Sequence, residues 1–360
     1  MNIYSFFYCL LVSVFCSAQE MSLGDFSMSN NASPAFMLVE ESPTAIFVPD
    51  NLKALSIYTM DNFGKNLSIE LSPYFFINTN KNGRTFYNYI GVDNESDASK
   101  RKQHPFSGLN TTTVSFAFVD KEFYGIVGKK KTYSVGLRTT FLRFYNTKKV
   151  YDNAKHISDT LAGLVTPSAI MEKGADAIKK YWEVHNDELS IALKPFLKTI
   201  KPLFRLDGAV AFSSLFKANT TNSDTAVRFG SWLTAQGSMI INEGSDSNYN
   251  NYFNVLFTAR YIDDGFNSYS NNDYFKLHYL DFGGKIALDY NNFTFGYEFI
   301  SRNGSINSSR SVGSIAFSIS TDITITGGFG KDFSTTNENL LTVFGINWGL
   351  NFGKKSISLY

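Results

Sequence analysis

The chain has 360 residues and a formal net charge of +1, and 43% of its residues are hydrophobic. A nearly neutral chain has no strong field that would steer it toward nucleic acid, so nucleic-acid binding is not expected. The 34 Phe and 20 Tyr residues instead favour pleated sheets and membrane interfaces.

Residues 1–18 have the pattern of a secretory signal peptide. An apolar run over residues 3–15 is followed by small residues up to Ala18, after which we expect cleavage. Lipidation of Cys16 is the alternative, but Phe15 stands where a lipoprotein needs a small residue. Both cysteines, Cys9 and Cys16, lie in this leader, so we expect a mature chain without disulfides.

Residues 19–52 form an irregular N-terminal arm. Pro34, Pro43 and Pro49 interrupt its short apolar clusters, and we expect a plug or an inward-folded arm. Neither this arm nor any later stretch approaches the ~20 apolar residues of a spanning helix. A membrane location therefore requires strands.

From residue 53 to residue 353, short segments alternate apolar residues with small or polar ones, and turn-forming residues separate them. A soluble sandwich would place Thr, Lys or Glu on its outer face, whereas Gly and Asn suit a crowded interior better. An even number of such segments, most of them reaching ~9–11 residues, predicts an all-β fold: a transmembrane antiparallel up-and-down β-barrel of about 12 strands. The predicted strands are 53–61, 66–76, 110–119, 131–144, 203–217, 225–240, 251–264, 274–290, 292–302, 311–320, 322–331 and 340–353.

A helical insertion is predicted at residues 145–202, between the fourth and fifth strands. Thr166 and Pro167 can begin one amphipathic helix that continues to Trp182, and Phe196 lies in a second. The insertion either packs on the barrel mouth as a cap or plug, or binds a partner or gates the barrel. Because eight strands follow it and the last should end in the periplasm, we expect it to be periplasmic. The 264–273, 303–310 and 332–339 connections are then expected to be long loops that face outward.

Two turns fix strand register. Asn291 and Asn292 suit a two-residue type I′ turn, which places Lys285 opposite Glu298 and Asp281 opposite Arg302. Apolar residues then pair on the other face, which supports this register. A three-residue turn over 320–322 is predicted next, because it pairs Ile319 with Ile323.

The final strand resembles a known export signal. Apolar residues alternate with Gly and Asn from Phe344 through Trp348 to Phe352, similar to the terminal motif that the barrel-assembly machinery recognises, and a tail follows at 354–360. The chain thus resembles bacterial outer-membrane β-barrel proteins, and its Asn and aromatic content and the Ser-Pro-rich arm at 33–49 resemble uncharacterised barrels of the Bacteroidota. The resemblance implies an outer-membrane location, with outer-membrane lipid and the assembly machinery as partners.

No motif indicates catalysis, so we expect a protein that is not an enzyme and has no cofactor. The four histidines, His104, His156, His185 and His278, do not have metal-ligand spacing. His156 and Ser158 are the only close His and Ser, and proximity in sequence does not define a hydrolase triad. Gly327, Gly328 and Gly330 lie in a strand pattern, so close packing is favoured over a phosphate loop.

The predicted lumen face carries six positive and five negative groups. Such a balance suggests either a wall made rigid by cross-strand ion pairs or a narrow polar conduit with weak ion selectivity. The predicted lumen-lining residues are Glu70, Arg138, Arg205, Asp207, Arg228, Arg260, Asp281, Lys285, Asp289, Glu298 and Arg302.

Two functions compete at this stage. One is a passive channel or transporter for small solutes, gated by the arm at 19–52 or by the helices at 145–202. The other is a non-transporting scaffold, adhesin or secretion accessory that binds protein partners, among them a periplasmic protein through 145–202. A barrel enzyme and a secreted soluble β-protein remain as further alternatives.

Overall fold

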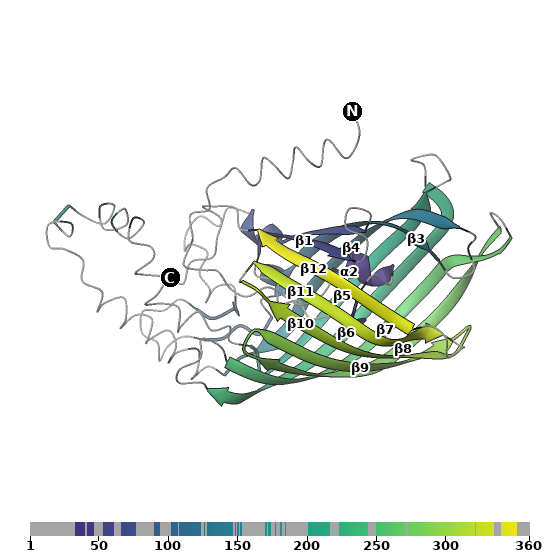
Figure 1. The fold of residues 1–360 in the computed structure, drawn as a ribbon. Helices are drawn as coiled ribbons and strands as arrows, with labels where there is room; N and C mark the ends of the chain where they lie inside the picture. Colours follow the sequence, from purple (N-terminus) through teal and green to yellow (C-terminus); the bar gives the residue numbers. More distant parts are fainter. Residues whose placement is uncertain are drawn as a thin grey trace.

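The fold is described from a computed structural model (Figure 1). The described residues are 33–39, 42–46, 53–60, 66–76, 90–93, 102–106, 108–123, 126, 128–146, 201–216, 223–243, 250–270, 273–320, 322–334 and 340–350, with isolated positions between 148 and 184. The predicted signal peptide and the C-terminal tail lie outside them.

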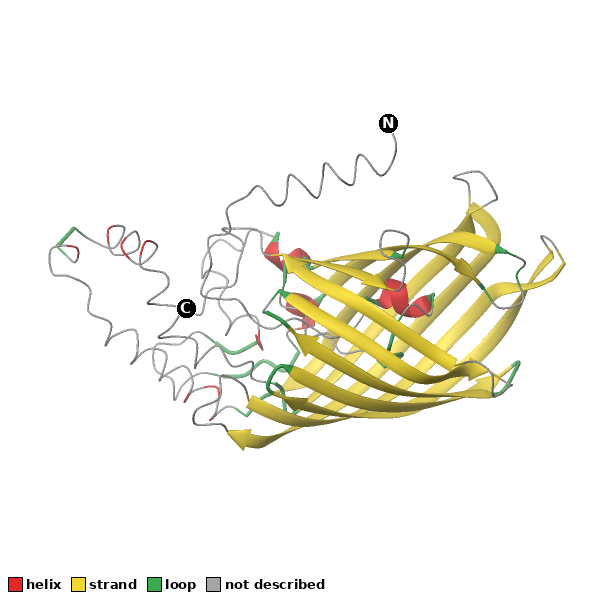
Figure 2. Cartoon of the chain, in the orientation of Figure 1, coloured by secondary structure: helices red, strands yellow, loops and turns green. Residues whose placement is uncertain are grey.

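Twelve strands form one closed barrel, which confirms the predicted fold class (Figures 1 and 2). Each strand pairs antiparallel with its neighbours in the chain, and β1 pairs with β12 to close the ring. Closure leaves no sheet edge, as a membrane-spanning sheet requires. The strands are β1 (Leu55–Met60), β2 (Leu67–Leu71), β3 (Thr113–Glu122), β4 (Lys129–Phe144), β5 (Phe204–Phe216), β6 (Ser223–Glu243), β7 (Asn250–Ser270), β8 (Asp273–Tyr290), β9 (Phe293–Gly304), β10 (Ser308–Ser318), β11 (Ile323–Ser334) and β12 (Leu340–Leu350).

The outer surface of the barrel is apolar and its interior is polar. Phe257, Phe295 and Phe299 expose 65%, 45% and 50% of their surface, whereas Lys285 and Glu298, on the opposite face of the same wall, are buried. Such an outward band would be unstable in water and is what a lipid-facing wall needs. The protein is therefore an outer-membrane β-barrel.

Both predicted registers are confirmed, but the predicted type I′ geometry is not, because Asn291 has a positive φ of 52° and Asn292 does not. The β8–β9 register pairs Lys285 with Glu298 and Asp281 with Arg302, as a two-residue turn requires. The β10–β11 register pairs Phe317 with Ile325, and the Ile319 amide donates to the Ile323 carbonyl at 2.9 Å. Local turn chemistry thus sets the register of two hairpins in this wall.

Several strand limits differ from the prediction. The stretches 264–273 and 303–310, expected as loops, are mostly strand, because β7 continues to Ser270 and β9 to Gly304. β11 likewise continues to Ser334. Their Asn, Asp and Ser residues suggested turns, but cross-strand hydrogen bonds hold such residues in a ladder beyond the apolar band.

At the other extreme, β1 and β2 have only six and five residues, fewer than the ~9–11 that cross the hydrocarbon. β2 stops before Pro73, which begins the short 3₁₀ helix η1 (Pro73–Phe75). A second 3₁₀ helix, η3 (Gly108–Thr111), leads into β3.

The connections 72–112 and 145–203 leave the barrel at the end where β1 begins and β12 ends. The predicted helices within 145–202 fall largely outside the described residues. None of the described helices is long and apolar enough to cross a membrane. One described helix, α2 (Pro34–Leu38), lies inside the barrel, as Figure 2 shows.

Candidate functional site

The barrel lumen is the candidate site, because many charged side chains are buried there and the apolar outer wall does not require them. Ten of the eleven predicted lumen-lining residues are buried, and the side chain of the remaining one, Asp289, is 15% exposed. All of them lie on the face opposite the apolar band.

Further lumenal charges were missed by the sequence reasoning. Arg143 lies inward because a β-bulge between Thr140 and Leu142 reverses the alternation after Arg138. Arg310 was missed because the strand was predicted to begin at residue 311. Asp264 is different: it lies inside its predicted strand, and simple alternation along β7 identifies it.

A first buried cluster surrounds Glu70 on β2. Arg138 approaches both carboxylate oxygens, with Nε 2.6 Å from Oε1 and Nη2 2.6 Å from Oε2. The Tyr58 hydroxyl donates to Oε2 at 2.8 Å, and the Thr113 hydroxyl also donates to this carboxylate. A two-pronged guanidinium contact with further donors is the arrangement that makes a buried ion pair tolerable.

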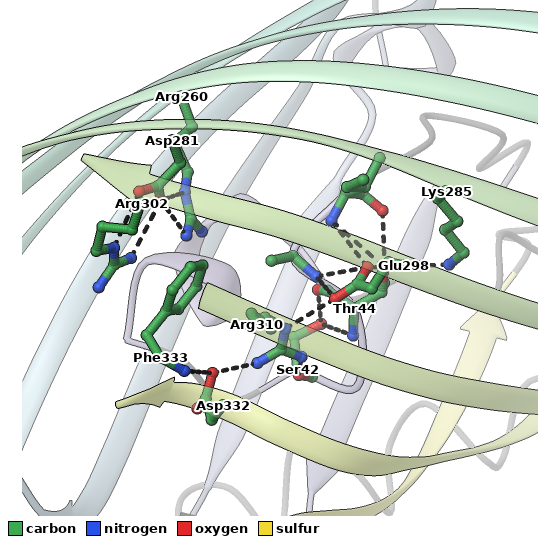
Figure 3. Close-up of polar contacts among 12 residues, drawn as sticks. Ser42, Thr44, Arg260, Asp281, Lys285, Glu298, Arg302, Arg310, Asp332 and Phe333 are labelled. Carbon is green, nitrogen blue, oxygen red and sulfur yellow. Dashed lines mark hydrogen bonds and ion pairs between the residues drawn. The ribbon is translucent and has the colours of Figure 1, made fainter. Parts of the chain in front are cut away.

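A second cluster joins β7, β8, β9 and β11 (Figure 3). Asp281 accepts from two arginines: Arg260 Nε and Nη2 lie 2.8 and 2.6 Å from Oδ2, and Arg302 Nε lies 2.9 Å from Oδ1. The guanidinium groups also lie over the ring of Phe333, at 5.2 and 3.6 Å from its centroid. The predicted pair Asp281–Arg302 therefore forms directly.

A third cluster attaches the N-terminal arm to the wall. Glu298 accepts from the backbone amides of Ala45 and Ile46 at 3.0 and 3.4 Å and from the Thr44 hydroxyl at 2.5 Å. On the wall side, Arg310 Nε donates to the same carboxylate at 2.8 Å. Lys285 donates to Thr44 Oγ1 at 3.0 Å, so the predicted Lys285–Glu298 pair is bridged by the arm (Figure 3).

Residues 33–39 and 42–46, here called the plug segment, cross the lumen. The Ala35 amide donates to Ser115 Oγ on β3 at 3.3 Å, while the Ala45 amide contacts Glu298 on β9. β3 and β9 are six strands apart in a ring of twelve, so they lie on opposite sides of the barrel. Between them, Arg228 Nη1 on β6 donates to the Leu38 carbonyl at 3.1 Å.

Lumenal glycines make room for the two Ser-Pro steps of the plug segment. A Cβ atom at Gly136 on β4 would lie 2.9 Å from Pro34 Cβ, and one at Gly328 on β11 would lie 2.8 Å from Pro43 Cβ. Ser33 also caps α2, since its hydroxyl accepts from the Phe36 amide at 3.3 Å. Gly327, Gly328 and Gly330 were predicted to ease close packing, and Gly328 does so against the plug segment.

The middle of the plug segment is apolar. Phe36, Met37 and Leu38 are almost fully buried against lumenal residues that include Tyr58 and Trp232. Burial of one such side chain contributes about 1.5–3 kcal/mol. Packing and the Glu298 contacts together hold the segment across the lumen.

The two ends of the lumen are narrowed by other elements. At the end where β1 begins, Lys201 Nζ lies 2.8 Å from Asp289 Oδ2, and the Lys201 amide donates to the Tyr252 hydroxyl. At the opposite end, a buried cluster includes Phe123, which follows β3, and Phe266 of β7, with ring centroids 5.1 Å apart. Lys201 comes from the end of the predicted helical insertion.

Two of the four histidines lie among the described residues. His104 Nε2 lies 2.6 Å from Asp93 Oδ1, and His278 is exposed beside Asp263 on the outer face. His156 and His185 lie outside the described residues. Within the described part of the chain, no group of three or more His, Cys, Asp and Glu is arranged to hold a metal ion.

The closed twelve-strand wall, its apolar outer band and its charged interior define an outer-membrane barrel of porin-like architecture. No protein-family model matches the chain, and no curated protein is similar to it in sequence.

Solved structures that match include one described as the NanC porin, with a TM-score of 0.34 and 8% identity, covering 83% of this chain and 100% of that chain. Another is the outer membrane protein Omp33 of Acinetobacter baumannii, with a TM-score of 0.33 and 9% identity, covering 83% and 98%. These values are too low to transfer the function of either protein.

Proposed function

We propose that the protein is a gated outer-membrane channel for small solutes, in which the plug segment closes the lumen and moves for solutes to pass. The position of the plug segment carries this proposal, because it contacts walls six strands apart, at Ser115 and Glu298. A segment placed in this way lies across the path that a solute would take through the middle of the lumen.

The chemistry of the lumen supports passage of polar solutes once the segment has moved. Withdrawal would expose the Glu298 carboxylate, the Arg310 guanidinium and Lys285, which the segment now covers. Because cations and anions are both present, the open lumen is expected to discriminate weakly by charge. No residue of this arrangement is assigned a catalytic role.

Deletion of residues 33–46 tests the proposal in planar lipid bilayers. The deletion variant should show a stable single-channel conductance well above that of the intact protein, because the obstruction is gone. Heat-modifiable migration in gels provides the check that the barrel has closed. A folded deletion variant that conducts no more than the intact protein would contradict the gating role.

A scaffold function is the second candidate, and one observation favours it. The long connections 72–112 and 145–203 both leave the barrel wall at the same end. If the function lies there, cross-linkers placed at Trp182 or Phe196 should capture a periplasmic protein in cells. Recovery of the barrel alone would contradict it.

A further inference from the structure

The largest buried apolar cluster among the described residues lies in the lumen. It is formed by residues from five strands together with α2, which packs on them. We call its strand residues the apolar recess: Tyr58 and Met60 on β1, Ala117 and Val119 on β3, Ala209 and Ala211 on β5, Trp232 on β6, and Val343 on β12.

The recess has a shape because its floor is built from small residues. Three of its members are alanines, and Gly230 beside it has no side chain, so Leu38 reaches a point 2.8 Å from where a Cβ atom would lie. Phe36 and Leu38 fill this space and are 0% and 1% exposed. A rigid wall alone does not require an internal space that holds two large side chains.

Hydrogen-bond donors lie at the margin of the recess. Arg228 Nη1 donates to the Leu38 carbonyl, which is an oxygen at the end of an apolar segment. Trp232 Nε1 is buried, and among the described residues it has no hydrogen-bond partner. The recess therefore offers apolar walls together with donors for an oxygen acceptor.

One side of the recess is formed by a short strand. Tyr58 and Met60 belong to β1, which with β2 forms the two shortest strands of the barrel as described. The described β1–β2 register runs from Leu55 opposite Leu71 to Thr59 opposite Leu67.

From these observations we infer that the apolar recess binds an amphiphile with an apolar chain and an oxygen-bearing head, in the manner of a fatty acid, when α2 leaves it. The chain takes the place of Phe36 and Leu38, and the head takes the place of the Leu38 carbonyl at Arg228 and reaches the Trp232 Nε1 donor. This inference names a ligand class for the proposed channel and rests on the proposed movement of the plug segment.

Binding of the fluorescent fatty acid cis-parinaric acid to the full-length protein in amphipol tests it. Phe36→Ser combined with Leu38→Ser weakens the competing segment, so the affinity for the probe should rise at least tenfold. In that background, Ala209→Phe fills the recess and should abolish saturable binding. The matched control is Ala287→Phe at another buried lumenal alanine, which should leave binding intact.

The donor at Trp232 gives a second readout. Trp232→Phe keeps an apolar ring and removes the N–H group, so it should weaken binding of parinaric acid severalfold. Binding of N-phenylnaphthylamine, a hydrophobic probe that has no oxygen acceptor, should be unchanged. Equal effects on both probes would contradict the predicted position of the head.

Conductance of the same variants separates the two proposals. If the double serine variant is folded and conducts but shows no saturable binding, the ligand site is wrong and the channel stands. If it binds the probe with the predicted pattern but never conducts, the ligand site stands and the channel is wrong. If Ala209→Phe and Ala287→Phe reduce binding of the probe equally, the ligand does not bind in the apolar recess.

Discussion

At residues 34–38 the plug segment packs apolar side chains against the apolar recess, whereas at residues 44–46 it presents backbone amides and a hydroxyl to the buried Glu298 carboxylate. Apolar contact is non-directional and scales with area, so it tolerates small shifts. Charge-assisted hydrogen bonds need one geometry. The polar end therefore sets where the segment lies, and the apolar end supplies much of its affinity for the lumen.

The largest effect is expected from the polar end. Glu298→Ala removes the acceptor of the plug segment and one of the two carboxylates that pair with Arg310, while Asp332 still pairs with it. Loss of a partner from a buried pair costs up to about 3–5 kcal/mol when the remaining charge is left uncompensated. A cysteine introduced at Ala45 should then react rapidly with a membrane-impermeant maleimide. Asp281→Ala breaks another buried ionic cluster, and it should leave position 45 protected. Equal labelling in both variants would show that Glu298 does not hold the segment.

The apolar end should respond next. Leu38→Ala leaves a cavity in the recess, which costs about 2–5 kcal/mol for a fully buried leucine. A cysteine at Ala35 should become accessible to the same reagent, while position 45 stays protected by Glu298. Leu340→Ala, at a leucine that is 68% exposed, is the control and should change neither rate. Simultaneous release of both ends would mean that they act as one unit.

Substitution of a lumenal glycine that contacts the plug segment should have an intermediate effect on closure of the lumen, although it removes no contact. Gly328→Ala places a methyl group 2.8 Å from Pro43 Cβ and 3.1 Å from its Cα, so the segment must shift, at about 1–3 kcal/mol. Gly237→Ala meets only the Leu203 carbonyl at 3.9 Å and is the control. Channel openings in bilayers should become more frequent for the first variant alone. If the two variants open equally often, the fit between Gly328 and Pro43 is not needed for closure.

The smallest effect concerns the wall rather than the segment. Asn291→Val forces a β-branched residue to adopt a φ of 52°, which costs about 1–2 kcal/mol, whereas Asn291→Gly should be tolerated. Urea unfolding of the refolded barrel measures the difference. A valine variant as stable as the wild type would mean that the register of β8 and β9 does not depend on this turn.

The wall could be predicted from the sequence because its determinants are local. Alternation and one pair of asparagines were enough to pair Asp281 with Arg302 across β8 and β9. The bulge after Thr140 was not predictable in this way, and it hid Arg143 from the lumen assignment. Strand ends were also misplaced, because turn-forming residues stay in a ladder when a partner strand is present.

The site itself was less accessible to such reasoning. The arm at 19–52 was expected as a plug or an inward-folded arm, but nothing in its own sequence identifies Glu298 as its partner, some 250 positions away. The fit of Pro43 to Gly328 likewise depends on the shape of the folded lumen. Asp264 is the exception: alternation along β7 places it in the lumen, but the predicted set omitted it.

The most direct test of the account is a disulfide that locks the plug segment to the wall. The Ser33 and Ser68 hydroxyl oxygens lie 2.5 Å apart, so Ser33→Cys with Ser68→Cys should form a disulfide in a mature chain expected to have no other cysteine. The pair Thr132→Cys and Ser213→Cys joins two wall strands and is the control. In single-channel recordings the oxidised Ser33→Cys, Ser68→Cys variant should stay closed, and it should open after the disulfide is reduced. The control should conduct in both states. A locked barrel that opens as often as the reduced one would contradict the account.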